Sequence, residues 1–368
     1  MNVDLKQLLR QTIEERASDL HLTQNTPPVL RIDGKLILTK HPPLSKDDLK
    51  KAIYGMLSDI QKEKFERDKE LDFSFALEGM DRFRINVHIQ RGAVEAAFRR
   101  ISTAIPNIKE LGLPPVITDF SRKPNGLVLI TGVTGSGKSS TLAAMVDLIN
   151  EERACMITSI EDPIEYVHQN KKSVIKQREV YSDTLSFAEA LKRCLRQDPD
   201  VIIVGEMRDL ETISMALTAA ETGHLVLSTL HTSDAAQTVE RIIDVFPAHQ
   251  QQQVRLQLST CLQGVVCQTL LPHAQGKGRV VATEVLVATP GIRNLIREKA
   301  IEQIPTAIQT GSQFGMHTMD ASLKMLFKAG VITYEEALTR VKDVQEFKQL
   351  LGTTETDPRS DFRGKPKR

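Results

Sequence analysis

The segment Gly132-Val-Thr-Gly-Ser-Gly-Lys-Ser139 constrains the fold more than any other part of the chain. It has the spacing of a phosphate-binding loop, in which glycines let the backbone wrap around phosphate without a Cβ clash. A short apolar run, Leu127–Ile130, precedes the loop, and apolar residues at helical spacing follow it. The order strand, glycine loop, helix therefore predicts a site where backbone N–H groups and a helix N-terminus face a phosphorylated ligand.

Within this loop each position has an expected task. Lys138 is expected to bridge the β- and γ-phosphates of ATP, and Ser139 to bind Mg²⁺. The other candidates for nucleotide binding are the remaining loop residues and the serine that follows, namely Gly132, Thr134, Gly135, Ser136, Gly137 and Ser140. A glycine turn that binds nothing is the alternative, and the flanking strand and helix argue against it.

Carboxylates follow two of the predicted buried strands. Glu161, Asp162 and Glu165 come after the strand Cys155–Ile160, and Glu206 comes after the strand Val201–Val204. Because parallel strands end at the ligand crevice, one carboxylate can orient the attacking water while another holds Mg²⁺, usually through water. Glu206 is the first candidate for both tasks, although aspartate is usual where Gly205 stands. For Glu165 the alternative is a solvated loop charge.

Two histidines bracket a further predicted strand, Leu225–Leu230. His224 precedes this strand and His231 follows it. Both are candidates for contacting phosphate or for relaying its presence to a neighbouring element. A lone histidine is more often a hydrogen-bonded structural residue, and from the residues alone this alternative stays open.

The pattern along the chain predicts two α/β domains. Residues 1–100 form the first, with a hairpin at Asp33-Gly34, a helix over Lys46–Lys64 and an alternating strand over Arg82–Gln90. Strands and helices alternate after residue 126, which predicts a mainly parallel sheet covered on both faces. We expect a linker at 101–113, a core at 114–290, a helical region at 291–352 and a disordered tail at 353–368.

Composition narrows the class of protein. The formal net charge is +1, which gives no overall attraction to nucleic acid or anionic lipid. The cysteines lack zinc-site spacing and are interpreted as small buried residues: Cys155, Cys194, Cys261 and Cys267. The N-terminus has no signal core and no apolar run reaches membrane-spanning length, so a cytoplasmic location is expected.

Taken together, these motifs resemble those of the secretion and type IV pilus ATPase superfamily, from residue 17 to about residue 351. Its phosphate loop, Asp box (Ile160–Glu165), atypical Walker B segment (Asp198–Asp209) and His box (Thr222–Thr232) occur in the superfamily's order. The resemblance implies a PAS-like N-terminal α/β domain, a RecA-like ATPase domain and a homohexamer that holds nucleotide between the two. It also implies that Arg84 and Arg99 act in trans on the transferring phosphate, although strand arginines can simply face solvent.

Within the superfamily, Gly291-Ile-Arg-Asn-Leu-Ile-Arg-Glu298 resembles the motif of the retraction ATPases of twitching motility, with glycine in place of the first alanine. The implied partners are an inner-membrane pilus platform protein and an accessory ATPase of the same kind, at the inner face of that membrane. A pilus-extension or secretion ATPase is the nearest alternative, but the long N-terminal extension and tetracysteine zinc motif expected of it are missing. Nucleic-acid translocation, for which no direct evidence is expected, and a scaffold that hydrolyses little are the others.

Overall fold

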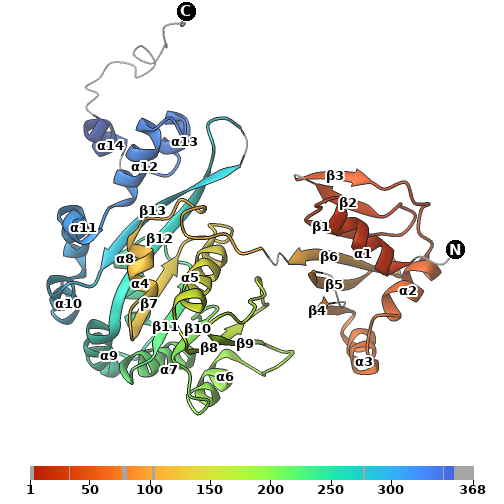
Figure 1. Cartoon of the computed structure of the whole chain (residues 1–368), viewed down its shortest axis with the longest axis horizontal. Coiled ribbons are helices and arrows are strands. Elements are labelled where there is room, and N and C mark those ends of the chain that lie inside the picture. The colour runs from red at the N-terminus through yellow and green to blue at the C-terminus, as the bar shows by residue number, and fades with distance from the viewer. Residues whose placement is uncertain are drawn as a thin grey trace, which may run out of the picture. The chain divides into compact units, whose positions relative to one another are not determined.

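The computed structural model describes residues 4–32, 34–76, 81–101, 104–276, 278–342 and 344–351. The chain divides into two compact units, which Figure 1 draws with their elements labelled. The first unit is Met1–Ile105 together with the segment Asp162–His168, and the second is Pro106–Glu161 together with Gln169–Arg368. The tail expected at 353–368 lies outside the described residues. Of the described helices, none has the length and hydropathy that a membrane crossing requires.

An antiparallel sheet of six strands forms the first unit, in the order β3-β2-β1-β6-β5-β4. Alternate residues of β5, namely Phe83, Ile85 and Val87, are buried, as the sequence pattern predicts. The strands are β1 (Asp19–Leu22), β2 (Val29–Ile32), β3 (Lys35–Leu38), β4 (Glu70–Ala76), β5 (Arg82–Gln90) and β6 (Ala93–Ile101). The helices are α1 (Leu5–Glu14), α2 (Lys46–Tyr54) and α3 (Asp59–Asp68).

One expectation in this unit is wrong. A single helix was predicted over Lys46–Lys64, but the chain forms α2 and then starts α3. The reason is a capping box at Ser58, whose hydroxyl accepts from the N–H of Gln61 while the Gln61 side chain accepts from the N–H of Ser58. The hairpin between β2 and β3 is confirmed, with Gly34 at φ +80°. Asp33 lies outside the described residues.

A sheet of seven strands forms the second unit, in the order β13-β12-β7-β11-β10-β8-β9. Every neighbouring pair is parallel except β12 with β13, so the expected mainly parallel sheet is confirmed. The strands are β7 (Gly126–Thr131), β8 (Met156–Glu161), β9 (Val174–Glu179), β10 (Val201–Val204), β11 (Leu225–Leu230), β12 (Leu262–Pro272) and β13 (Arg279–Val287).

Helices cover both faces of this sheet. Leu127 and Leu129 of β7 belong to one buried cluster, and Val128 and Ile130 belong to another on the opposite face. The helices of the core are α4 (Val116–Ser121), α5 (Lys138–Glu152), α6 (Phe187–Cys194), α7 (Leu210–Glu221), α8 (Ala235–Asp244) and α9 (Ala248–Cys261). The helices after β13 are α10 (Pro290–Arg297), α11 (Ile304–Thr310), α12 (Met319–Lys328), α13 (Tyr334–Leu338) and α14 (Val344–Leu351).

Several strands were not predicted from the sequence: β1, β9, β12 and β13. For β12 the reason is local, because α9 ends at Cys261 and the strand begins at Leu262 with no turn residues between them. Three of the four cysteines, at positions 194, 261 and 267, are buried and Cys155 is half-buried, and all four are free thiols.

Candidate active site

The glycine loop after β7 has a backbone that only glycine can supply. Gly132, Gly135 and Gly137 lie at φ +141°, +80° and +91°. A Cβ on Gly132 would stand 2.3 Å from the carbonyl oxygen of Gln268, closer than any real contact. The motif read from the sequence is therefore a conformational requirement and also sets how closely β12 approaches the loop.

The groups at the start of α5 suit a bound anion. Gly137 is the N-cap and supplies no side-chain cap, so water or a ligand must satisfy part of the first turn. The Lys138 ammonium donates to the carbonyls of Gly132 at 2.8 Å and Val133 at 3.1 Å, which folds it over the loop. The buried hydroxyl of Ser136 has no hydrogen-bond partner among the described residues. An uncapped helix start, a cation and an unpaired hydroxyl fit a phosphate group.

The strand ends bring the predicted residues to one edge of the sheet. In the parallel register Thr131 pairs with Leu230, and Val204 pairs with Ser228 and Ile160. The phosphate loop, His231, Glu206 and Glu161 each continue from one of these strand ends. The side chains therefore gather at the carboxyl edge, where a doubly wound sheet binds ligands.

Glu206 is held by two cationic or hydrogen-donating side chains. Its Oε1 lies 3.0 Å from His231 Nε2 and 2.6 Å from Arg208 Nε. Burial by itself would raise the pKa of Glu206, but the hydrogen bonds from Arg208 and His231 lower it below its ordinary value. Both donors use the same oxygen, so Oε2 is left to face a water molecule. Arg208 was not singled out from the sequence, although it lies only two residues after Glu206.

The backbone around Glu206 is fixed to its neighbours. The Thr229 hydroxyl donates to the carbonyl of Gly205 at 2.6 Å, and the N–H of Met207 donates to the carbonyl of Thr229 at 3.2 Å. A Cβ on Gly205 would lie 3.2 Å from the carbonyl oxygen of Ile160 and 3.3 Å from Glu161 Cα. The close approach of β8 therefore disfavours a larger residue at Gly205, which explains why the usual aspartate is missing.

The Asp-box carboxylates separate into two groups. Glu161 ends β8 and accepts from the Ser159 hydroxyl at 2.6 Å and from Gln177 Nε2 at 3.0 Å. Asp162 and Glu165 are exposed and belong to the segment Asp162–His168 of the first unit. The structure thus brings Glu161 to the sheet edge and gives Asp162 and Glu165 no position relative to the loop.

His224 does not join this edge. It precedes β11, and its carbonyl accepts from the N–H of Gly126, at the start of β7. Its Nδ1 donates to the carbonyl of Ala219 at 2.9 Å. Within the chain, His224 therefore lies at the amino edge of the sheet and His231 at the carboxyl edge. The two candidates were proposed as a pair, but only His231 lies beside the acidic site.

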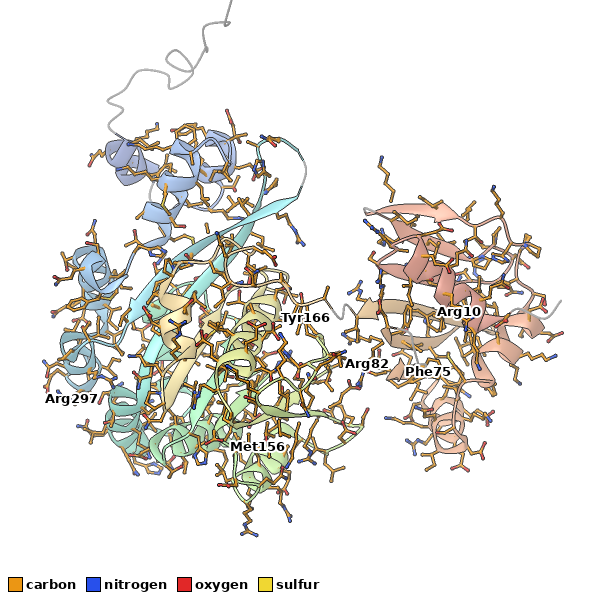
Figure 2. The ribbon with its side chains drawn as sticks, viewed as in Figure 1. Arg10, Phe75, Arg82, Met156, Tyr166 and Arg297 are labelled. Carbon is orange, nitrogen blue, oxygen red and sulfur yellow. The ribbon has the colours of Figure 1, made fainter. Side chains whose placement is uncertain are left out.

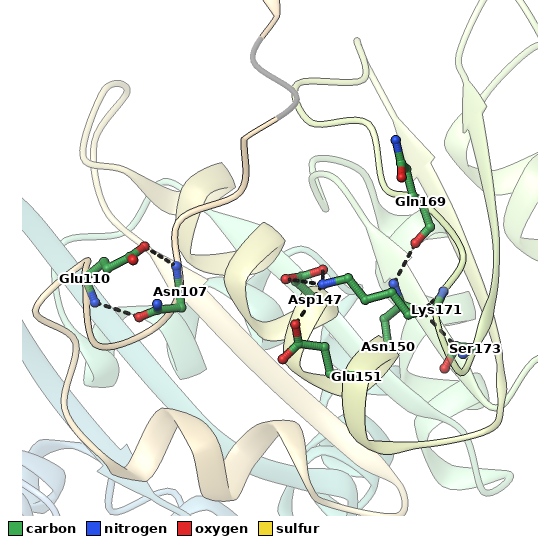
Figure 3. A network of polar contacts seen from close by, with 8 residues as sticks. All are labelled: Asn107, Glu110, Asp147, Asn150, Glu151, Gln169, Lys171 and Ser173. Carbon is green, nitrogen blue, oxygen red and sulfur yellow. Dashed lines mark hydrogen bonds and ion pairs between the residues drawn. The ribbon is translucent and has the colours of Figure 1, made fainter.

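A polar network fixes the helix that follows the loop (Figure 3). Buried Asn150, on α5, donates to the carbonyl of Gln169 at 2.8 Å and accepts from the N–H groups of Lys171 and Ser173. The Lys171 ammonium lies 2.8 Å from carboxylate oxygens of both Asp147 and Glu151. The chain that returns after the Asp box is therefore attached to α5.

In the first unit, Arg84 and Arg99 lie opposite each other on β5 and β6, so they share one face of the antiparallel sheet. Both are exposed. Arg99 Nε lies 2.8 Å from the buried carboxylate of Asp19 on β1. Burial opposes ionisation of Asp19, but hydrogen bonds from Ser18 and Arg99 hold its pKa below the ordinary value. Asp19 thus orients Arg99 while leaving most of the arginine accessible.

The motif at the start of α10 has one internal and one external arginine. Arg293 donates to the carbonyl of Ala288 at 3.0 Å and to that of Ser259, near the end of α9, at 2.7 Å. It therefore caps α9 and fixes α10 against it. Arg297 is exposed and lies at the outside of the second unit (Figure 2).

Comparison with known proteins identifies the family. The profile of the type II/IV secretion system proteins matches residues 1–339. The chain belongs to this family. Accordingly it is an ATPase, and its core has the RecA-like fold expected from the motifs.

Particular relatives are more specific. The chain is 49% identical over 345 residues to the type IV pilus retraction ATPase PilT of Pseudomonas aeruginosa, which covers 94% of this chain and 100% of that one. It is 48% identical to a twitching motility protein of Neisseria gonorrhoeae, covering 86% of this chain and 84% of the relative. A crystal structure of the pilus retraction motor PilT with bound ADP superposes with a TM-score of 0.89 at 48% identity, covering 95% and 100% of the two chains.

Proposed function

We propose that this ATPase powers retraction of a type IV pilus, and that its fuel site is the carboxyl edge of the second sheet. The observation that carries the site is Glu206, held by His231 and Arg208 on a strand end beside the phosphate loop. The retraction assignment is supported by similarity to retraction ATPases along nearly the full length of both chains.

The residues of the site divide the work of hydrolysis. The loop N–H groups and Lys138 bind the β- and γ-phosphates, and the hydroxyl of Ser139 is the ligand for Mg²⁺, which neutralises phosphate charge when bound. Glu206 Oε2 accepts a hydrogen bond from the attacking water and takes its proton. His231 and Arg208 keep Glu206 ionised for that step. Glu161 and, through the Asp box, Asp162 and Glu165 help to order water around the metal.

The assembly and its setting are part of the proposal. Chains of this kind form a homohexamer in which Arg84 and Arg99 of one subunit stabilise charge on the phosphate held by its neighbour. His224 responds to the neighbouring subunit rather than to its own phosphate loop. The ring works in the cytoplasm beside the inner membrane, acting on the pilus platform protein, with an accessory ATPase of the same kind as a second partner.

Hydrolysis tests the site directly. Lys138→Met is expected to abolish ATP hydrolysis by weakening nucleotide binding, and EDTA is expected to stop the wild type because Ser139 needs its metal. Glu302→Gln, an exposed substitution away from the site, serves as the control. Equal hydrolysis by wild type and Lys138→Met would contradict the assignment of the site.

Deletion in the host tests the direction of the motor. Surface pili that persist or accumulate while twitching is lost support retraction, because extension then continues unopposed. Loss of surface pili favours the extension alternative instead. Stimulation of hydrolysis by DNA would favour a nucleic-acid translocase.

A further inference from the structure

We propose that Gln268 is a positioning residue that holds the phosphate loop in its nucleotide-binding shape. This inference rests on the proposed nucleotide site and adds to it a residue from a distant strand. Gln268 lies on β12, whose register places Cys267 beside Thr131, the last residue before the loop. The side chain is therefore directly under the loop rather than at its mouth.

Both ends of the Gln268 amide are used. Its Nε2 donates to the carbonyl of Ser136 at 2.8 Å, and its Oε1 accepts from the hydroxyl of Thr141 at 2.9 Å. Ser136 lies in the loop and Thr141 in the first turn of α5, so one side chain joins the loop to the helix start. Gln268 is only 3% exposed, as are Ser136 at 2% and Thr141 at 1%. Hydrogen bonds in such a dry site are costly to leave unmade.

The same residue also fixes the glycine positions. Its carbonyl oxygen lies where a Cβ of Gly132 would be, and its Nε2 would be 3.2 Å from a Cβ of Gly137. The loop is thus shaped from below by Gln268, while Lys138 closes over it from above the glycines. A loop whose carbonyls are tied down keeps its N–H groups directed at phosphate before nucleotide arrives, which lowers the ordering cost of binding.

The chain offers a matched control on the same strand. Gln263 of β12 donates through Nε2 to the carbonyl of Asn125 at 3.1 Å, just before β7 begins. It also lies against a glycine, since its Nε2 would be 2.5 Å from a Cβ of Gly126. The two glutamines therefore make the same kind of contact at opposite ends of β7, and only Gln268 touches the loop.

The test compares Gln268→Met with Gln263→Met in the full-length protein, using equilibrium binding of a fluorescent ADP and steady-state ATP hydrolysis. Two hydrogen bonds of ordinary strength predict that Gln268→Met raises both the Kd for ADP and the KM for ATP by about tenfold. The same loss predicts a fall in kcat of less than about threefold, because saturating ATP re-forms the loop. Gln263→Met is expected to change stability but not these constants.

The outcomes separate the hypotheses. An unchanged Kd in folded Gln268→Met, or an equal rise in Gln263→Met, overturns the inference even if the wild type binds ADP and retracts pili. If Gln268→Met does not fold, Thr141→Val and Thr141→Ser decide: weaker ADP binding by valine alone supports the relay, and equal affinities overturn it. A wild type that binds no ADP would instead remove the proposed nucleotide site itself.

Discussion

The two sheets of this protein present functional side chains in different ways. In the second unit the central strands run parallel, so the residues that follow β7, β8, β10 and β11 all emerge at one edge. In the first unit every pair is antiparallel, so strand ends alternate. Its charged residues instead form a row across a face, where Asp19 lies between Arg31 and Arg99, with Arg84 beyond. A parallel sheet collects loops, whereas an antiparallel sheet collects side chains at matching register.

The carboxyl edge of the parallel sheet gives the largest expected effect. Glu206→Gln removes the proposed base but keeps the shape of the side chain, so kcat should fall by about a hundredfold or more, the usual contribution of general-base catalysis. ADP affinity should stay within about threefold because the loop is untouched. Steady-state hydrolysis and fluorescent-ADP binding measure the two. A near-normal kcat would show that another carboxylate, such as Glu161, is the base.

The face of the antiparallel sheet gives the next effect. Arg99→Ala should lower turnover of the assembled protein by about tenfold or more, since it removes a cation aimed at the transferring phosphate. Folding should change little, because Arg99 is largely exposed. Hydrolysis rate and melting temperature are the measurements, with the exposed Arg10 of α1 as the control in Arg10→Ala (Figure 2). Identical turnover in the two variants would leave Arg99 with only its link to Asp19.

A smaller effect sharpens the electrostatics of the parallel edge. Arg208→Met removes one of the two hydrogen bonds that lower the pKa of Glu206 against the effect of burial. The pKa of Glu206 should therefore rise, and the acid limb of the kcat profile should move to higher pH, with a smaller loss at neutral pH than in Glu206→Gln. The pH dependence of kcat measures this. An acid limb at the wild-type position would mean that ionisation of Glu206 does not limit the rate.

The smallest effect concerns a buried carboxylate behind the same edge. Burial raises the pKa of Glu284, on β13, above its ordinary value of 4.5. The folded state then keeps a proton that the unfolded state releases, so stability is lost as pH rises through the interval between the two values. Glu284→Gln can still accept from the N–H of Ala235, and it should gain about 1 kcal/mol relative to wild type as pH rises.

Thermal melts across pH, with Glu240→Gln on the exposed side of α8 as the control, test this last prediction. The difference in melting temperature between Glu284→Gln and wild type should grow with pH. A constant difference would show that Glu284 is ionised in both states throughout the range.

Much of the second unit could be predicted because its signals are local. Short apolar runs between glycines and acids located β10 and β11 with the bounds that the structure has. The loop pattern located Gly132 and Lys138, and the residue after a buried strand located Glu206. The strands that escaped prediction lack such punctuation. β12 follows α9 directly, and β9 is rich in charged residues because it lies at the edge of the sheet.

The sequence by itself determined which residue types meet phosphate, since that chemistry is written in consecutive positions of one loop. Only the tertiary structure decided what supports them. Gln268 reaches the loop because β12 pairs with β7, and His231 reaches Glu206 because β11 lies beside β10. His224 was separated from His231 by the length of one strand. Spacing along the chain encodes local geometry, whereas contact between distant segments depends on strand order and register, which no single segment carries.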